Sequence, residues 1–143
     1  MKIEVSNGEI VDKLTILDIK LRLISDKGKL ENVRKEFNEL SPIVKSIYDD
    51  LNKENRERLE SLHNQLQEVN QKLWYIEDDI RILEAQKDFE LKFVELARSV
   101  YFTNDERAKL KKEINLLTGS LLVEEKSYED YSWPYWYIKK YNK

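Results

Sequence analysis

Two acidic side chains near the N-terminus, Glu9 and Asp12, are the first that could do chemistry. They lie one turn apart on a predicted helix, and Asp12 falls in line with the apolar residues Ile16, Ile19 and Leu23. An acid on an inward stripe needs a partner, because an unpaired buried charge is costly. Alternatively, Asp12 lies near the start of the helix, where the helix dipole favours an acid.

A second acidic group, Glu77, Asp78 and Asp79, lies in the middle of the chain. Three consecutive residues point in three directions on a helix, so one metal ion cannot use all three. A divalent-metal site could still pair Glu77 with Asp12 or Glu9 from another helix, as in carboxylate-lined bundles. We favour the other interpretation, in which these acids are edge charges on a solvated helix.

Positive charge that could bind an anion comes from a later stretch of the chain. Arg107 and Lys111 are one turn apart on one helix face, with Asn104 nearby and Arg98 further back. Such a cluster could bind a phosphate or a carboxylate. It could equally neutralise acids such as Glu77 within the fold, and we favour this second role.

The segment after Gly119 has no clear helical period and carries polar residues, among them Glu125 and Lys126. Polar, non-helical segments are where sites often lie. No catalytic triad is visible, and His63, the one conventional base, falls among glutamine and asparagine residues. We therefore expect His63 at the surface, and whether the chain is an enzyme stays open.

Composition excludes several kinds of site and partner. With Cys 0 and His 1, a thiol nucleophile, a zinc finger and a multi-histidine metal site are excluded. The net charge of −3 has the wrong sign for a dedicated nucleic-acid binder. No apolar run is long enough to span a membrane, and the segment MKIEVSNGEI lacks the apolar core of a signal peptide. We expect a cytoplasmic protein with no membrane span and no nucleic-acid partner.

The elements that must position these residues are helices, because Gly 3 and Pro 2 are too few for the turns of an all-β fold. Ser6 and Glu9 have the spacing of a capping box, which predicts a helix from there to about Ser25. This helix has two apolar stripes, so we expect neighbours on two sides of it. The next elements that we predict are a turn at 26–28 and a second helix over 29–40. A stop at Ser41-Pro42 then separates this helix from a short third helix over 43–51.

The strongest pattern of the chain is a heptad seam of about 25 residues. Its apolar positions are Leu59, Leu62, Leu66, Val69, Leu73, Ile76, Ile80 and Leu83. Packing within the chain, as an antiparallel hairpin, and a coiled-coil homodimer both explain the seam, and both stay open. Trp74 and Tyr75 fall outside the seam, which indicates a second layer over this part of the helix.

The seam loses phase after Leu83, which predicts a bend or a new helix near Lys87-Asp88. Thr103 and Glu106 repeat the capping-box spacing and predict the start of a further helix there. Gly119 lies where a left-handed C-terminal cap belongs. We find no linker or repeat, and predict a single helical domain over 1–143, with a core of about 6–118 and a tail over 119–143.

The tail is rich in aromatic residues, which disordered segments usually lack. Pro134 blocks a helix in it. We predict a non-helical aromatic strap that folds back over the bundle. The alternative is an exposed surface for a partner, since tryptophan and tyrosine give large contact area at low entropic cost. The candidate partner-binding residues are Trp74, Trp133, Tyr135 and Trp136.

Several blocks together resemble a family of uncharacterised, mostly helical proteins of bacteria and their viruses. The opening block is Ser6-x-Gly8-Glu9-x-x-Asp12-Lys13-x-Thr15-Ile16-Leu17. The later blocks are Leu73-Trp74-x-Ile76-Glu77-Asp78 with Arg81, then Ala97-Arg98-x-Val100-Tyr101-x-x-Asn104-Asp105-x-Arg107-Ala108-x-x-Lys111 with Ile114-Asn115, and Gly119-Ser120 with Val123-Glu124-Glu125-Lys126-Ser127-Tyr128. The resemblance covers about residues 3–131, although 52–71 carries no motif of the family and the tail after Tyr131 departs from it.

The resemblance implies a domain of unknown function. Relatives are often encoded beside, or fused to, glycosyltransferases and tetratricopeptide repeats in surface-polysaccharide gene clusters, which is neighbourhood and not mechanism. It supplies no catalytic residues. The candidate ligand-binding residues are Glu9, Asp12, Lys13, Glu77, Arg81, Arg98, Asn104, Arg107, Lys111, Glu125 and Lys126.

Two functions from different classes follow. The first is a non-catalytic helical module that binds a protein partner or a second copy, accessory to glycan or cell-surface assembly. The second is a small all-α enzyme or ligand binder for a phosphorylated compound, such as a nucleotide or nucleotide-sugar. No cofactor is expected under the first function, and Mg²⁺ only under the second. The second function requires the candidate ligand-binding residues to line one pocket.

Overall fold

The computed structural model describes residues 1–131 and builds them from helices, with no strand in this part of the chain. The helices are α1 (Asn7–Leu23), α2 (Lys27–Asp49), α3 (Lys53–Ala85) and α4 (Leu91–Leu117). The predicted all-α bundle is confirmed. None of the four helices has the length and hydropathy that crossing a membrane requires.

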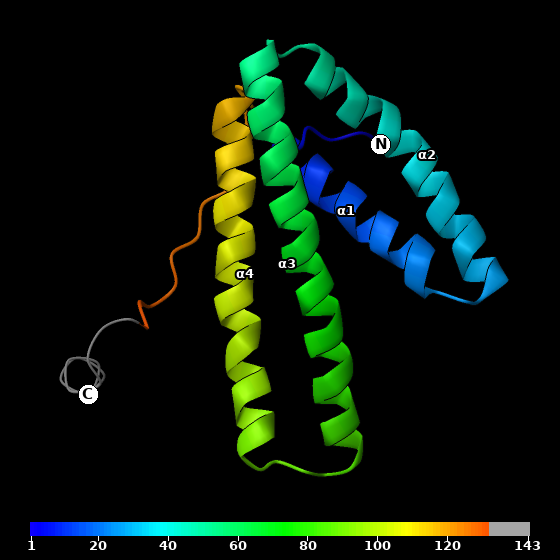
Figure 1. Ribbon diagram of the computed structural model, residues 1–143, viewed down its shortest axis with the longest axis vertical. Coiled ribbons are helices and arrows are strands. Elements are labelled where there is room, and N and C mark those ends of the chain that lie inside the picture. The colour runs from blue at the N-terminus through cyan, green and yellow to red at the C-terminus, as the bar shows by residue number, and fades with distance from the viewer. Residues whose placement is uncertain (132–143) are drawn as a thin grey trace.

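The helices form a long antiparallel hairpin with a shorter helix pair beside it (Figure 1). α3 packs along α4, while α1 contacts α2, α3 and α4, which confirms the prediction that α1 has neighbours on two sides. In Figure 1, α1 leaves α3 at an angle, and the lower half of the α3–α4 hairpin extends beyond both α1 and α2. All four helices are therefore present at one end of the bundle, whereas the other end consists of α3 and α4.

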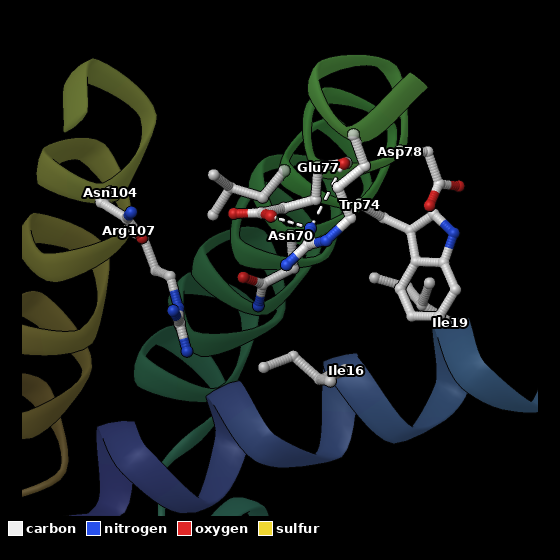
Figure 2. A pocket seen from close by; sticks show the side chains of 10 residues that line it. Ile16, Ile19, Asn70, Trp74, Glu77, Asp78, Asn104 and Arg107 are labelled. Atoms are coloured by element: carbon white, nitrogen blue, oxygen red, sulfur yellow. Dashed lines mark hydrogen bonds and ion pairs between the residues drawn. The ribbon is translucent and has the colours of Figure 1, made fainter. Parts of the chain in front are cut away.

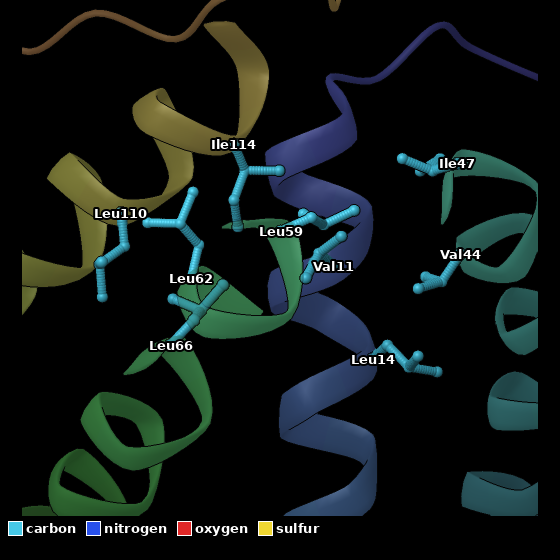
Figure 3. Close-up of a cluster of buried hydrophobic side chains, with 9 residues drawn as sticks. All are labelled: Val11, Leu14, Val44, Ile47, Leu59, Leu62, Leu66, Leu110 and Ile114. Atoms are coloured by element: carbon cyan, nitrogen blue, oxygen red, sulfur yellow. The ribbon is translucent and has the colours of Figure 1, made fainter. Parts of the chain in front are cut away.

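The apolar core lies at this four-helix end (Figure 3). It is formed by Val11, Leu14, Val44, Ile47, Leu59, Leu62, Leu66, Leu110 and Ile114. The first positions of the heptad seam thus pack within the chain, against α1 and α4. The prediction of a homodimer stays open, since a second copy can use another surface.

Local sequence signals place the helix ends. Ser6 caps α1 by accepting a hydrogen bond from the backbone amide of Glu9, which confirms the first capping box. Asp26 caps α2 in the same way, so the predicted turn at 26–28 is short and the helix begins at Lys27. Gly119 has φ +62° and follows the last helical residues, which confirms the left-handed cap after α4.

Two predicted helix boundaries were wrong. Pro42 does not end a helix, because α2 is continuous through it. Proline has no N–H to donate to the carbonyl oxygen four residues earlier, but Pro42 is exposed, so water can donate to that oxygen instead. Thr103 does not begin a helix either, because it is buried in the middle of α4. The spacing of a capping box also arises inside a helix when the apolar stripe simply continues.

The start of α1 lies unusually close to the end of α4, and Gly8 permits this. Its amide nitrogen donates to Asn115 Oδ1 at 2.6 Å, in a buried contact. A Cβ atom at position 8 would overlap the carbonyl oxygen of Lys111 and lie 2.9 Å from Asn115 Oδ1. Asn7 adds bonds to Thr118 and Ser120, so the two helix ends are joined over several residues.

We expect Gly8→Ala to destabilise the fold by about 1–3 kcal/mol, because the backbone of α4 must move to admit the methyl group. Gly28→Ala is the matched control, since the nearest atom to a Cβ there is 3.4 Å away and alanine favours a helix. Urea denaturation followed by circular dichroism measures both. Equal stability of Gly8→Ala and the wild type would contradict this packing.

The prediction that His63 lies at the surface was wrong. The side chain is half-buried where α3 faces α2. Its Nδ1 lies 2.9 Å from the hydroxyl of Tyr48. Burial lowers the pKa of His63 below its usual 6.5, although the charges of Asp18 and Glu60 oppose the shift. Burial also raises the pKa of Tyr48, to about 12. Both side chains are therefore neutral at pH 7, and the contact joins α2 to α3.

The lowered pKa of His63 predicts a pH dependence of stability. In the unfolded chain His63 binds a proton near pH 6.5, whereas in the folded chain it does so only at lower pH. The contribution of His63 to the free energy of unfolding is therefore fully present above pH 6.5 and is lost as the pH falls through the pKa of the folded state. We expect the free energy of unfolding to decrease from about pH 7.5 to about pH 5.5. His63→Gln should flatten this slope. An unchanged slope in the variant would exclude His63 as its source.

Candidate functional site

Asp12 is the centre of a buried polar cluster that joins α1, α3 and α4. Its carboxylate is 1% exposed and accepts two hydrogen bonds from Arg107, at 2.8 and 2.5 Å. Asn70 Nδ2 donates to Asp12 Oδ1 and to Thr15 Oγ1, and Thr15 donates to the Asp12 carbonyl. The hydrogen bonds to Asp12 raise the pKa of Arg107 further, against its partial burial. The two parallel hydrogen bonds therefore hold Arg107 in one orientation against Asp12.

Lys111, one turn along α4, holds a second group of charges. Its ammonium lies 2.6 Å from Glu9 and 3.0 Å from Glu124. Burial lowers the pKa of Lys111, but hydrogen bonds to the two carboxylates outweigh burial and the net shift is upward. The hydrogen bond from Lys111 in turn lowers the pKa of Glu124. Lys111 thus ties the start of α1 and the segment after α4 to the same helix.

A pocket of about 490 Å³ opens beside the Asp12–Arg107 pair (Figure 2). It lies where α1 leaves α3, between α1, α3 and α4. The residues that line it are Ile16, Ile19, Asn70, Leu73, Trp74, Glu77, Asp78, Arg81, Asn104 and Arg107. In Figure 2, Arg107 and Asn104 lie on the α4 side, whereas Trp74 and Ile19 lie on the opposite side.

The pocket thus contains five of the residues predicted as candidates, Trp74 among them. Four further candidates within residues 1–131 lie outside the pocket and have their own partners. Lys13 pairs with Glu36 on α2, Arg98 lies over the ring of Phe102, Glu125 pairs with Lys112, and Lys126 lies over the ring of Tyr128. Trp133, Tyr135 and Trp136 lie outside the described residues.

The proposed pairing of Glu77 with Asp12 or Glu9 around a divalent metal ion does not form. Glu77 pairs with Arg81 one turn away, Asp12 with Arg107, and Glu9 with Lys111. Within residues 1–131, no three potential metal-binding side chains gather in one place. These three carboxylates are instead each paired with a basic side chain of the same or another helix.

Asn70 and Thr15 are the site residues that sequence reasoning missed. Asn70 follows the seam position Val69 and is polar, which predicts an exposed edge, yet it is only 5% exposed. Its partner Asp12 lies 58 residues away in the chain, so no local spacing reveals the bond. One signal was available: an asparagine next to the apolar seam, on a helix expected to pack against the helix that carries Asp12.

We expect Asp12→Asn to destabilise the fold by about 3 kcal/mol, because it leaves the partly buried guanidinium of Arg107 without its counter-charge. The double variant Asp12→Asn with Arg107→Gln should lose less than the sum of the single losses, since it removes both charges. Arg81→Gln, which breaks an exposed pair, is the control and should cost less than about 0.5 kcal/mol. Chemical denaturation of the wild type, the two single variants, the double variant and the control measures the coupling, and strict additivity would contradict it.

Comparison with known proteins identifies a family without adding an activity. No curated protein and no solved structure matches the chain. One family model does, described as a family of unknown function, DUF6165, and it matches residues 1–136. That range includes every residue of the Asp12 cluster, the Lys111 cluster and the pocket. The chain belongs to the DUF6165 family.

Proposed function

We propose that this chain is a non-catalytic helical interaction module that associates with a second copy through the outer face of α4. The observation that carries the proposal is a second apolar stripe on this helix, formed by Leu91, Val94, Tyr101 and Phe102 and called the outer stripe below. Their spacing of 3, 7 and 1 residues places them on one face. They are 69%, 47%, 42% and 39% exposed.

The outer stripe is additional to the face by which α4 packs against α3. That inner face carries Leu96 and Val100, which are half-buried, and Thr103 and Leu110, which are buried. A helix at the surface of a monomer needs only one apolar face, so two faces indicate a helix between two layers. Tyr131 covers the end of the stripe, with ring centroids 5.3 Å from Tyr101 and 4.6 Å from Phe102.

A second copy is the occupant that the charges of α4 favour. In an antiparallel pair of α4 helices related by a twofold axis near residues 96–97, Leu91 faces Phe102 of the other copy. The same register sets Glu95 against Arg98 of the other copy, twice over, because a twofold interface repeats each contact. The patch is small, so the expected association is weak, with a dissociation constant in the micromolar range.

The distribution of basic residues supports a binding module over an enzyme that acts on phosphorylated compounds. Arg81, Arg107 and Lys111 each pair with a carboxylate, and Arg98 lies against an aromatic ring. A phosphate would have to compete with these internal partners. The setting we propose, glycan or cell-surface assembly, rests on the family resemblance alone.

Sedimentation velocity over a range of concentrations tests the proposal. We expect a monomer–dimer equilibrium for the wild type, and about tenfold weaker association for Glu95→Arg and for Arg98→Glu, since each sets like charges against each other. The double variant restores opposite charges and should recover the wild-type affinity. Glu39→Lys, an exposed change on α2, is the control.

Two results would contradict the proposed interface. The first is a wild type that stays monomeric at all concentrations, which would leave a different protein as the occupant of the outer stripe. The second is dimerisation that none of the α4 charge reversals affects, which would place the interface on another surface.

A further inference from the structure

The pocket between α1, α3 and α4 is not used by the proposed self-association, because none of its lining residues belongs to the outer stripe. Its volume of about 490 Å³ lies within the range of small-molecule sites. It exists because α1 is held against α4 at Asp12 and then leaves α3 at an angle (Figure 1). The pocket is therefore a fixed consequence of how the helices cross.

One side of the pocket is apolar and contains a large aromatic ring. Trp74 of α3 lies there with Leu73, and α1 contributes Ile16 and Ile19. Trp74 is half-buried beside these residues of α1, as a second layer over the helix requires, whereas Tyr75, the other ring that predicted such a layer, is 53% exposed. An indole face of this kind packs well against a flat or saturated ring.

The other side offers hydrogen-bonding groups that the fold leaves free. Arg107 binds Asp12 through Nε and Nη2, so the described residues give its Nη1 no partner. Asn104 lines the pocket one turn away and makes no hydrogen bond within residues 1–131. Asn70 uses only its Nδ2, for Asp12 and Thr15, and its Oδ1 remains as an acceptor. Donors and acceptors from α3 and α4 thus line the same pocket as the tryptophan.

The charges around the pocket nearly cancel. Arg107 is neutralised by Asp12 and Arg81 by Glu77, and Asp78 adds one more negative charge without an ion-pair partner in the described chain. A phosphate or a carboxylate placed here would meet Asp12, Glu77 and Asp78 as well as the two arginines. The electrostatic balance therefore disfavours an anion and admits a neutral ligand.

We infer that this pocket binds a neutral, polyhydroxylated ring, which is the chemistry of a sugar unit. The ring packs its C–H face on Trp74, and its hydroxyl groups donate to the carboxylates and to Asn70 Oδ1 and accept from Arg107 Nη1 and Asn104. Each hydroxyl group both donates and accepts, so it suits a site that mixes the two. The inference does not depend on the proposed dimer.

Fluorine NMR on the full chain labelled with 5-fluorotryptophan tests this directly. The chain has three tryptophans, and Trp74→Phe identifies the signal of Trp74 by its loss. The probes are N-acetylglucosamine and maltose as neutral sugars, and glucose 6-phosphate as the charged one. We expect at least one neutral sugar, at up to about 50 mM, to shift the Trp74 signal along a saturable curve, and glucose 6-phosphate to bind more weakly.

Asn104→Leu is the variant that tests the polar side, because Asn104 makes no bond that the fold needs. It should keep the wild-type melting temperature and weaken the sugar about tenfold, whereas Asn64→Ala, an exposed change elsewhere on α3, should have no effect. Three results would overturn the inference: no shift of Trp74 with either neutral sugar, a stronger response to glucose 6-phosphate, or shifts confined to Trp133 and Trp136. Sedimentation velocity of the same samples measures dimerisation separately. The sugar-binding inference and the proposed dimer are therefore tested by different measurements.

Discussion

The structure depends on one buried ion pair, between Asp12 and Arg107. A carboxylate that is 1% exposed is tolerated only with a partner of opposite charge and good geometry. The two hydrogen bonds from Arg107 supply both, and they fix the position of α4 against α1. Once these helices are set, the start of α1 must approach the end of α4 so closely that only glycine fits at position 8.

The same ion pair decides what chemistry the surface can offer. Because each of the basic residues near the pocket has a carboxylate partner, positive charge that would otherwise attract phosphate is consumed within the fold. What remains for binding is a tryptophan face, two asparagine side chains and one free edge of a guanidinium. The cluster is thus structural in its centre, at Asp12, and contributes to the pocket at its margin, through Arg107 and Asn70, with Asn104 beside them.

The sequence predicted the helices better than it predicted their contacts. Apolar periodicity identified α1 and the seam of α3, and side-chain chemistry identified the cap at Ser6 and the left-handed Gly119, because these signals act within a few residues. It failed at Pro42 and Thr103, where tertiary packing keeps a helix going through a local stop or start signal. It named Asp12 as an acid on an inward stripe and Arg107 as part of a basic cluster but could not pair them, since the bond spans 95 residues.

That long separation also orders events during synthesis. α1 is complete early, yet the carboxylate of Asp12 has no counter-charge until Arg107 has left the ribosome. At about 5–20 residues per second, the wait is roughly 5–20 s. During this interval α1 can associate with α2, whereas the α3–α4 hairpin forms only later. The nascent chain therefore carries an unmatched acid on the apolar face of its first helix until its last helix arrives.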